Sequence, residues 1–214
     1  GQALAELRGQ LRAWKKIDLD LRDVERLADA LQEVRRTQWV PLERFGAVTT
    51  RTVSLQPRQG HFTLKEDWGL REFPEMLRLY GRALHKVDGG WLNAFGWSNI
   101  GIERYFDEYF GRTANLNRIV SVGGFSADEI EQLIETVNER AKPGEIAAIE
   151  LNASCHNVNF PFGTILEEAL RRAVPKSRHP VILKVSPDED YHWQANLAAT
   201  YGCAAITAIN TVKG

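Results

Sequence analysis

The chain has 214 residues, 43% of them hydrophobic, and a formal net charge of -1 at pH 7. It is long and apolar enough for one domain with a sizeable core. No basic tract indicates nucleic-acid binding, and no apolar run approaches the ~20 residues of a membrane span. Cys155 and Cys203 form neither a disulfide framework nor a metal-binding pair, so we expect a reduced, cytoplasmic setting.

Residues 1–40 are predicted to form two helices. Apolar residues recur there at helical spacing, at Leu4, Leu7, Leu11 and Trp14 and again at Val24, Leu27, Leu31 and Val34. Such a pair is typical of a packed helical hairpin. The basic residues of the first helix leave a membrane-surface role as a weaker alternative.

The next segment, 46–55, is rich in β-branched residues and predicts a strand. A helix is expected at about 74–85, because Pro74 suits a first helical position.

Strands and helices are then predicted to alternate. The strands are expected at 118–124, 146–151, 180–185 and 203–209, and the helices at 102–110, 127–140, 164–173 and 192–201. Ser126 and Glu129 have the spacing of a capping box, Gly202 suits the position after a helix, and Cys203 is expected to be inert core. Apolar strands separated by helices predict βαβ units and a parallel sheet.

Polar residues follow the 146–151 strand in the segment ELNASCHNVN. The amides of Asn152 and Asn157 suit a carbonyl-rich ligand, because each amide both donates and accepts hydrogen bonds. Cys155 is a candidate nucleophile, base or metal ligand, and the bland alternative is a polar turn with a half-buried thiol. Lys184 lies within an apolar strand, where a buried cation is expensive unless it is paired. Its alternative is a side chain that extends outward into solvent.

The segment ELNASCHN resembles the E-L-N-x-S-C-P-N segment of the dihydroorotate dehydrogenases, with His156 where that family has Pro. Five further segments resemble the family in its own order: FGAVTTRTVSLQPRQG, LNAFGWSNIGIERYF, IVSVGGFSADE, PVILKVSPD and AITAINTVKG. The resemblance implies an α/β fold, a (β/α)8 TIM barrel that is incomplete in this chain. We therefore expect a helical segment at 1–40 and a barrel domain at 41–214. The chain is longer than the family pattern at 61–90, which implies an insertion there, typically a surface excursion such as a lid or an oligomer contact.

The resemblance also implies an activity, the FMN-dependent oxidation of dihydroorotate to orotate in pyrimidine biosynthesis. Cys155 would take a proton from C5 while a hydride passes from C6 to the flavin. Implied substrate contacts are Asn93, Asn152, Asn157, Asn210 and Thr211, and implied cofactor contacts are Lys184, Arg51, Thr52 and Ser121. No metal is implied.

Two kinds of protein remain open at this point. One is a flavin enzyme for dihydroorotate or a related pyrimidine, working as a homo-oligomer or with a partner chain that completes the barrel. The other is a truncated or divergent, non-catalytic barrel that acts as an interaction or structural subunit and needs a partner chain. Bound FMN distinguishes the two.

Overall fold

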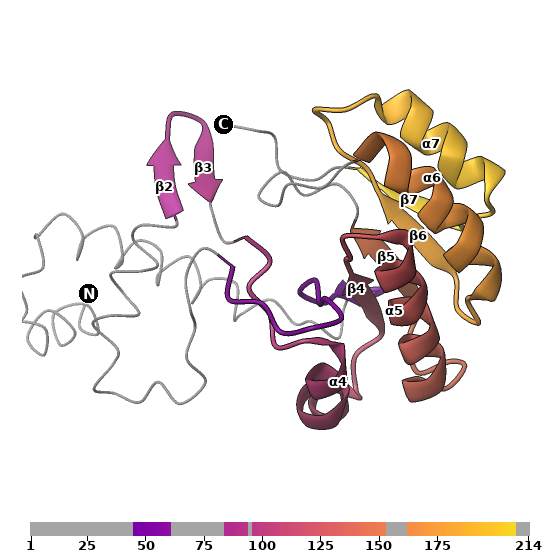
Figure 1. The fold of residues 1–214 in the computed structure, drawn as a ribbon. Helices are drawn as coiled ribbons and strands as arrows, with labels where there is room; N and C mark the ends of the chain where they lie inside the picture. Colours follow the sequence, from indigo (N-terminus) through magenta and orange to yellow (C-terminus); the bar gives the residue numbers. More distant parts are fainter. Residues whose placement is uncertain (1–44, 61–83, 94–95, 153–161, 209–214) are drawn as a thin grey trace, which may run out of the picture. The chain divides into compact units, whose positions relative to one another are not determined.

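The structure is a computed structural model that describes residues 45–60, 84–93, 96–152 and 162–208 (Figure 1). The chain divides into two compact units, Gly1–Val40 with Leu64–Asn93 and Pro41–Thr63 with Ala94–Gly214. The helices expected at 1–40 and most of the helix expected at 74–85 lie outside the described residues. Among the helices that are described, none is long and apolar enough to cross a membrane.

In the first unit the structure describes a β-hairpin. Strand β2 (Leu84–Val87) pairs antiparallel with β3 (Gly90–Asn93), and Asp88 and Gly89 form the turn, with Gly89 at φ 80°. The expectation of helix is therefore wrong at residues 84–85. An Asp-Gly pair between two short strands favours a tight hairpin turn, because glycine adopts positive φ without strain.

The second unit contains a parallel sheet in the order β1-β4-β5-β6-β7. Its strands are β1 (Val48–Thr49), β4 (Arg118–Val122), β5 (Ala148–Asn152), β6 (Val181–Lys184) and β7 (Ala205–Thr207). Within this unit each strand lies beside the next one along the chain, with no reversal of order. That arrangement is typical of a barrel and unlike a doubly wound sheet, whose strand order reverses. The predicted α/β barrel class is confirmed, and the described strands form part of such a barrel.

Three helices connect the last four strands and cover one face of the sheet (Figure 1). They are α5 (Ala127–Arg140), α6 (Phe162–Ala173) and α7 (Tyr191–Thr200), and α6 continues into a 3-10 turn, η4 (Val174–Lys176). Before β4 the chain is helical in three short pieces, α4 (Ile102–Arg104), the π-helix η2 (Tyr105–Tyr109) and the 3-10 helix η3 (Phe110–Thr113). The predicted helices at 127–140, 164–173 and 192–201 are confirmed.

The hydrophobic core lies between the sheet and these helices. Because successive side chains of a strand point to opposite faces, alternate residues of β4, β5 and β6 are buried against α5 and α6. These are Val120, Val122, Ile149, Leu151, Val181 and Leu183 from the sheet, and Ile130, Leu133, Ile134, Leu166 and Leu170 from the helices. The residues that alternate with these place their side chains on the opposite face of the sheet.

The start of α5 follows the predicted capping pattern with one change. The Ser126 hydroxyl accepts a hydrogen bond from the Glu129 N–H at 3.1 Å, as expected of an N-cap. The Glu129 carboxylate accepts from the N–H of Phe125 at 2.7 Å, one residue earlier than the usual capping-box donor.

The predicted strand at 46–55 is broken by a bulge. Thr50 N donates to Ile119 O at 2.9 Å, whereas the next such bond runs from Val53 N to Ser121 O, also at 2.9 Å. Three residues on this strand therefore advance against two on β4, so one extra residue is inserted. The bulge ends regular pairing after Thr49 and redirects Arg51 and Thr52.

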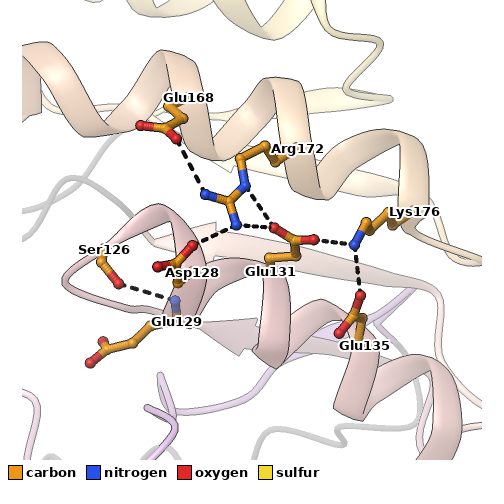
Figure 2. Close-up of polar contacts among 8 residues, drawn as sticks. All are labelled: Ser126, Asp128, Glu129, Glu131, Glu135, Glu168, Arg172 and Lys176. Atoms are coloured by element: carbon orange, nitrogen blue, oxygen red, sulfur yellow. Dashed lines mark hydrogen bonds and ion pairs between the residues drawn. The ribbon is translucent and has the colours of Figure 1, made fainter.

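An ion-pair network joins α5 to α6 on the outer side of the sheet (Figure 2). Arg172 contacts the carboxylates of Asp128 at 2.5 Å, Glu131 at 2.5 Å and Glu168 at 3.2 Å. Lys176 contacts Glu131 and also Glu135, the latter at 2.9 Å. Glu131 is the central carboxylate, since both cations bind it. Hydrogen bonds from Lys176 and then Arg172 hold the pKa of Glu131 below its ordinary value of 4.5.

Replacing Glu131 with Gln should lower the stability of the protein in a pH-dependent way. A carboxyl whose folded pKa is depressed contributes its full stabilisation above its unfolded pKa and loses it as the pH falls through the folded value. The difference in urea midpoint between wild type and Glu131→Gln should thus be largest above about pH 4.5 and shrink below it. Glu139→Gln, at an exposed position of the same helix, is the control. A difference that stays constant down to pH 3 would contradict this account.

Gly123 is required by the packing of Trp97 at the end of β4. A Cβ added at Gly123 would lie 2.5 Å from Cη2 of the Trp97 ring and 2.9 Å from two further ring atoms. Trp97 is 7% exposed, has φ 54°, and its ring centroid lies 5.4 Å from that of Phe125. The indole ring therefore occupies the space that a side chain at position 123 would fill.

Gly123→Ala should destabilise the protein by about 1–3 kcal/mol, the usual range for forcing one methyl group into a packed interior. Chemical unfolding measures this, with Gly111→Ala as the matched control because a Cβ there meets nothing within 4 Å. Equal unfolding midpoints for the two variants would show that the indole moves freely.

Candidate functional site

A row of polar side chains lies on the face of the sheet opposite the helices. It contains Ser121 of β4, Glu150 and Asn152 of β5, Lys184 of β6 and Thr207 of β7. Ser121 pairs in register with Glu150, and Asn152 with Lys184, which pairs in turn with Thr207. Asn152, Lys184 and Thr207 are the last residues of their strands, Ser121 is one residue before the end of β4, and Glu150 is the middle residue of β5. The carboxyl ends of the strands are the end at which barrel proteins bind ligands.

Hydrogen bonds connect three of these strands, β4, β5 and β7, with Thr52 from the segment after β1, in one chain that we call the polar chain. It runs from Asn152 Nδ2 to Thr52 Oγ1 at 2.9 Å, and from Thr52 Oγ1 to Ser121 Oγ at 3.0 Å. Ser121 Oγ donates to Glu150 Oε1 at 3.0 Å, and Thr207 Oγ1 donates to Glu150 Oε2 at 2.9 Å. The bulge after β1 allows Thr52 to take part. Ser121, Glu150 and Asn152 are 1%, 2% and 5% exposed, so these bonds form away from water.

The bond between Glu150 and Thr207 also reports the shape of the sheet. These residues belong to β5 and β7, and β6 lies between them. Neighbouring strands are about 4.8 Å apart, so two side chains on alternate strands meet only if they lean together across the middle strand. Such convergence is expected on the concave side of a curved sheet. The polar chain therefore lies on the barrel-interior face.

Among the polar residues described on this face, Lys184 is the cation. Its side chain is half-buried at the last position of β6, and it forms no ion pair among the residues that the structure describes. Its strand neighbours on the same face are Asn152 and Thr207. A positive charge set among amide and hydroxyl groups suits an electron-rich or anionic ligand.

The loop after β1 is held in place by Asn99. Its Oδ1 accepts from Ser54 N at 3.1 Å and from Gly101 N at 2.9 Å, and its Nδ2 donates to Trp97 O at 2.7 Å. The backbones of Arg58 and Asn99 also exchange two hydrogen bonds of 2.9 Å. These contacts fix the segment that carries Arg51 and Thr52.

The structure brings together four of the predicted site residues, Thr52, Ser121, Asn152 and Lys184. Arg51 lies in the bulge with an exposed side chain. Asn93 is the last residue of β3, which belongs to the first unit. The remaining predicted residues, Cys155, Asn157, Asn210 and Thr211, lie outside the described residues.

Two members of the polar chain were missed from the sequence, Glu150 and Thr207. Glu150 carries the same signal that singled out Lys184, a charged residue inside an apolar strand. Glu150 also lies two residues before Asn152 in the strand, which predicts that both side chains lie on the same face of the sheet. Thr207 has no local signal, because its role depends on the curvature that brings β7 toward β5.

The fold is that of a (β/α)-barrel protein, and the polar residues at the carboxyl ends of its strands are a candidate ligand site. The sequence comparisons are more specific. The chain matches the family model described as dihydroorotate dehydrogenase over residues 32–214, and it belongs to that family.

Individual relatives agree with the family match. The chain is 32% identical over 188 residues to the Dihydroorotate dehydrogenase B (NAD(+)), catalytic subunit, of Geobacter metallireducens, covering 82% of this chain and 54% of that protein. It is 32% identical over 190 residues to the protein of the same name from Trichlorobacter lovleyi, covering 83% and 55% respectively. The chain thus spans about half the length of the curated relatives it matches.

The thiol of Cys203 is half-buried against the core, after α7. Desolvation by burial raises its pKa from 9.0 to about 11. Since the thiolate is the reactive form, about 100-fold less of it exists near pH 8 than for an unperturbed cysteine.

Alkylation of Cys203 by iodoacetamide should therefore be slow at pH 8 and still accelerate above pH 10. Peptide mass spectrometry measures the rate, and the same peptide in urea-unfolded protein is the control. A rate that levels off near pH 9 in the folded protein would contradict the effect of burial.

Proposed function

We propose that this chain is part of an FMN-dependent dihydroorotate dehydrogenase that oxidises dihydroorotate to orotate in pyrimidine biosynthesis. The observation that carries the proposal is the polar chain with Lys184 beside it, on the barrel-interior face, at the strand ends where this fold binds its ligands. Family membership supplies the class of reaction. The amide, hydroxyl and ammonium groups of the polar face supply hydrogen-bond donors for the oxygens of a carbonyl-rich ring.

The described residues fit a flavin. Lys184 offers a positive charge and N–H donors, and Thr52 and Ser121 add hydroxyl groups at the neighbouring strand ends. We propose that these three residues, with Arg51, hold the cofactor. FMN supplies an acceptor for the hydride that dihydroorotate loses from C6, and a cation near its ring favours the added electron density.

We propose Cys155 as the base. It follows β5 by three residues, and its thiolate would accept the proton that leaves C5 of dihydroorotate. This role requires a thiolate near neutral pH, which a neighbouring cation favours. Asn152 would hold the substrate ring from the strand end. Asn93, Asn157, Asn210 and Thr211 complete the proposed substrate contacts.

The wider organisation is proposed on the same basis. Residues 41–214 form the barrel domain, with an insertion at 61–90, and residues 1–40 form a helical segment. The relatives are named as NAD(+)-type catalytic subunits, so we propose that this chain acts beside a second kind of subunit that passes electrons toward NAD(+). A homo-oligomer of the catalytic chain is compatible with this assembly.

Changing Cys155 to Ala should lower the turnover of dihydroorotate by about 10²–10⁴-fold, the usual contribution of a positioned base. The protein should keep its flavin, because the proposed cofactor residues are untouched. The measurement is dihydroorotate-dependent reduction of an artificial acceptor, alongside the visible spectrum and intact mass of the same sample. Cys203→Ala is the matched control and should retain turnover within about twofold.

Two outcomes would overturn the proposal. One is a colourless protein of the correct mass that takes up no added FMN, which would favour a non-catalytic subunit. The other is a Cys155→Ala variant that turns over dihydroorotate at the wild-type rate, which would exclude Cys155 as the base.

A further inference from the structure

Glu150 is a buried charged residue that the proposed reaction does not use. Its side chain is 2% exposed, at the middle position of β5. Its carboxylate accepts a hydrogen bond at each oxygen, from Ser121 at 3.0 Å and from Thr207 at 2.9 Å. An ionised carboxylate accepts at both oxygens, whereas a protonated one carries an O–H donor at one of them. The two hydroxyl groups therefore suit the ionised form.

Among the described residues, no cation forms an ion pair with this carboxylate, and Lys184 likewise has no ion-pair partner there. The positive and the negative charge of this face are therefore not paired with each other. Hydroxyl groups stabilise a buried carboxylate by hydrogen bonding, but they leave its net charge in place. Because a protein interior screens charge less than water does, the field of Glu150 reaches other groups on the barrel-interior face.

Strand register places Glu150 close to Lys184 and deeper in the barrel. Asn152 pairs with Lys184, and Glu150, two residues earlier on β5, pairs with Ile182. Thr207 pairs with Lys184 on its other side. The hydrogen bond from Thr207 to Glu150 therefore crosses β6 beside Lys184, on the barrel-interior face. A ligand bound at the strand ends has Lys184 nearest to it and the negative charge of Glu150 one layer deeper.

These two charges act on a bound flavin in opposite ways. The hydride from C6 of dihydroorotate brings two electrons and one proton, and their addition leaves a negative charge on the flavin ring. A cation beside the ring favours this reduced form, and a carboxylate in the same poorly screened region opposes it. Lys184 therefore raises the reduction potential of the flavin, and a charged Glu150 lowers it.

We propose that Glu150 lowers the reduction potential of the bound flavin, by partly offsetting the charge of Lys184 on the barrel-interior face. The inference rests on the proposed function, which places FMN beside Lys184. A flavin with a lowered potential passes its two electrons on to the next acceptor more readily. A merely structural Glu150, which ties β5 to β4 and β7, would depend on its hydrogen bonds and not on its charge.

Glu150→Gln tests the effect of the charge, because the amide has almost the same volume and still offers a donor and an acceptor to the two hydroxyl groups. The midpoint potentials of bound and free FMN give the ratio of the affinities of the protein for reduced and oxidised FMN. This ratio should rise about 5–30-fold, as expected for the loss of a unit charge about 8–17 Å away at an effective dielectric constant of about 20. For a two-electron couple the rise corresponds to about 20–45 mV. Glu139→Gln, exposed on α5, is the matched control and should leave the ratio unchanged.

Two further variants separate the charge from the hydrogen bonds. Glu150→Asp keeps the charge but shortens the side chain, which draws it away from Ser121 and Thr207, and the ratio should stay within about twofold of the wild type. Glu150→Met removes the charge with an apolar side chain of similar length. It should raise the ratio as Glu150→Gln does, and it provides a second neutral variant if the amide disturbs folding.

Three results would contradict these expectations. An unchanged ratio in the neutral variants would overturn the proposal while the bound flavin, and with it the proposed function, stands. A shift in Glu150→Asp as large as that in Glu150→Gln would assign the effect to the hydrogen bonds and would also overturn it. A wild-type protein whose visible spectrum shows no uptake of added FMN would overturn the proposed function, and this inference would fall with it.

Discussion

The curvature of the sheet is the constraint on which the candidate site depends. The hydrogen bond from Thr207 to Glu150 joins two strands with a third between them, and it forms because the sheet is curved. Curvature in turn follows from the strand order, since a sheet that adds each strand beside the last and covers one face with helices bends toward its uncovered face. The polar residues of that concave face are thereby brought within hydrogen-bonding distance of one another.

Much of this fold is predictable from local sequence. The helices at 127–140, 164–173 and 192–201 are predicted by the helical spacing of their apolar residues, and α5 also by the N-cap residue Ser126. Both signals are local, because they depend only on residues of the same helix. The bulge after Thr49 is not predictable in this way, since it depends on what β4 offers opposite. The hairpin at 84–93 is predictable from the turn signal Asp88-Gly89. The helix predicted at about 74–85 overlaps the first two residues of this hairpin, and there the prediction is wrong.

The candidate site, too, is predictable from local sequence only in part. Asn152 and Lys184 stand out because polar groups at the ends of apolar strands need a reason to be there. The partnership of Ser121, Thr52 and Glu150 cannot be deduced from spacing, because their positions lie 29 and 69 residues apart along the chain. Register places Ser121 opposite Glu150, and the extra residue of the bulge brings Thr52 to both Ser121 and Asn152.

The strict alternation of β5 has a consequence for how this protein can change over evolutionary time. Substitutions on the concave face leave the helix-packed face untouched, so ligand preference and core stability can vary independently. A one-residue insertion or deletion within β5 is different, because it would exchange the two faces, placing Leu151 among the polar groups and Asn152 in the core. Length variation should therefore be confined to loops and to edge positions such as the bulge beside β1, while the central strands diverge by substitution alone.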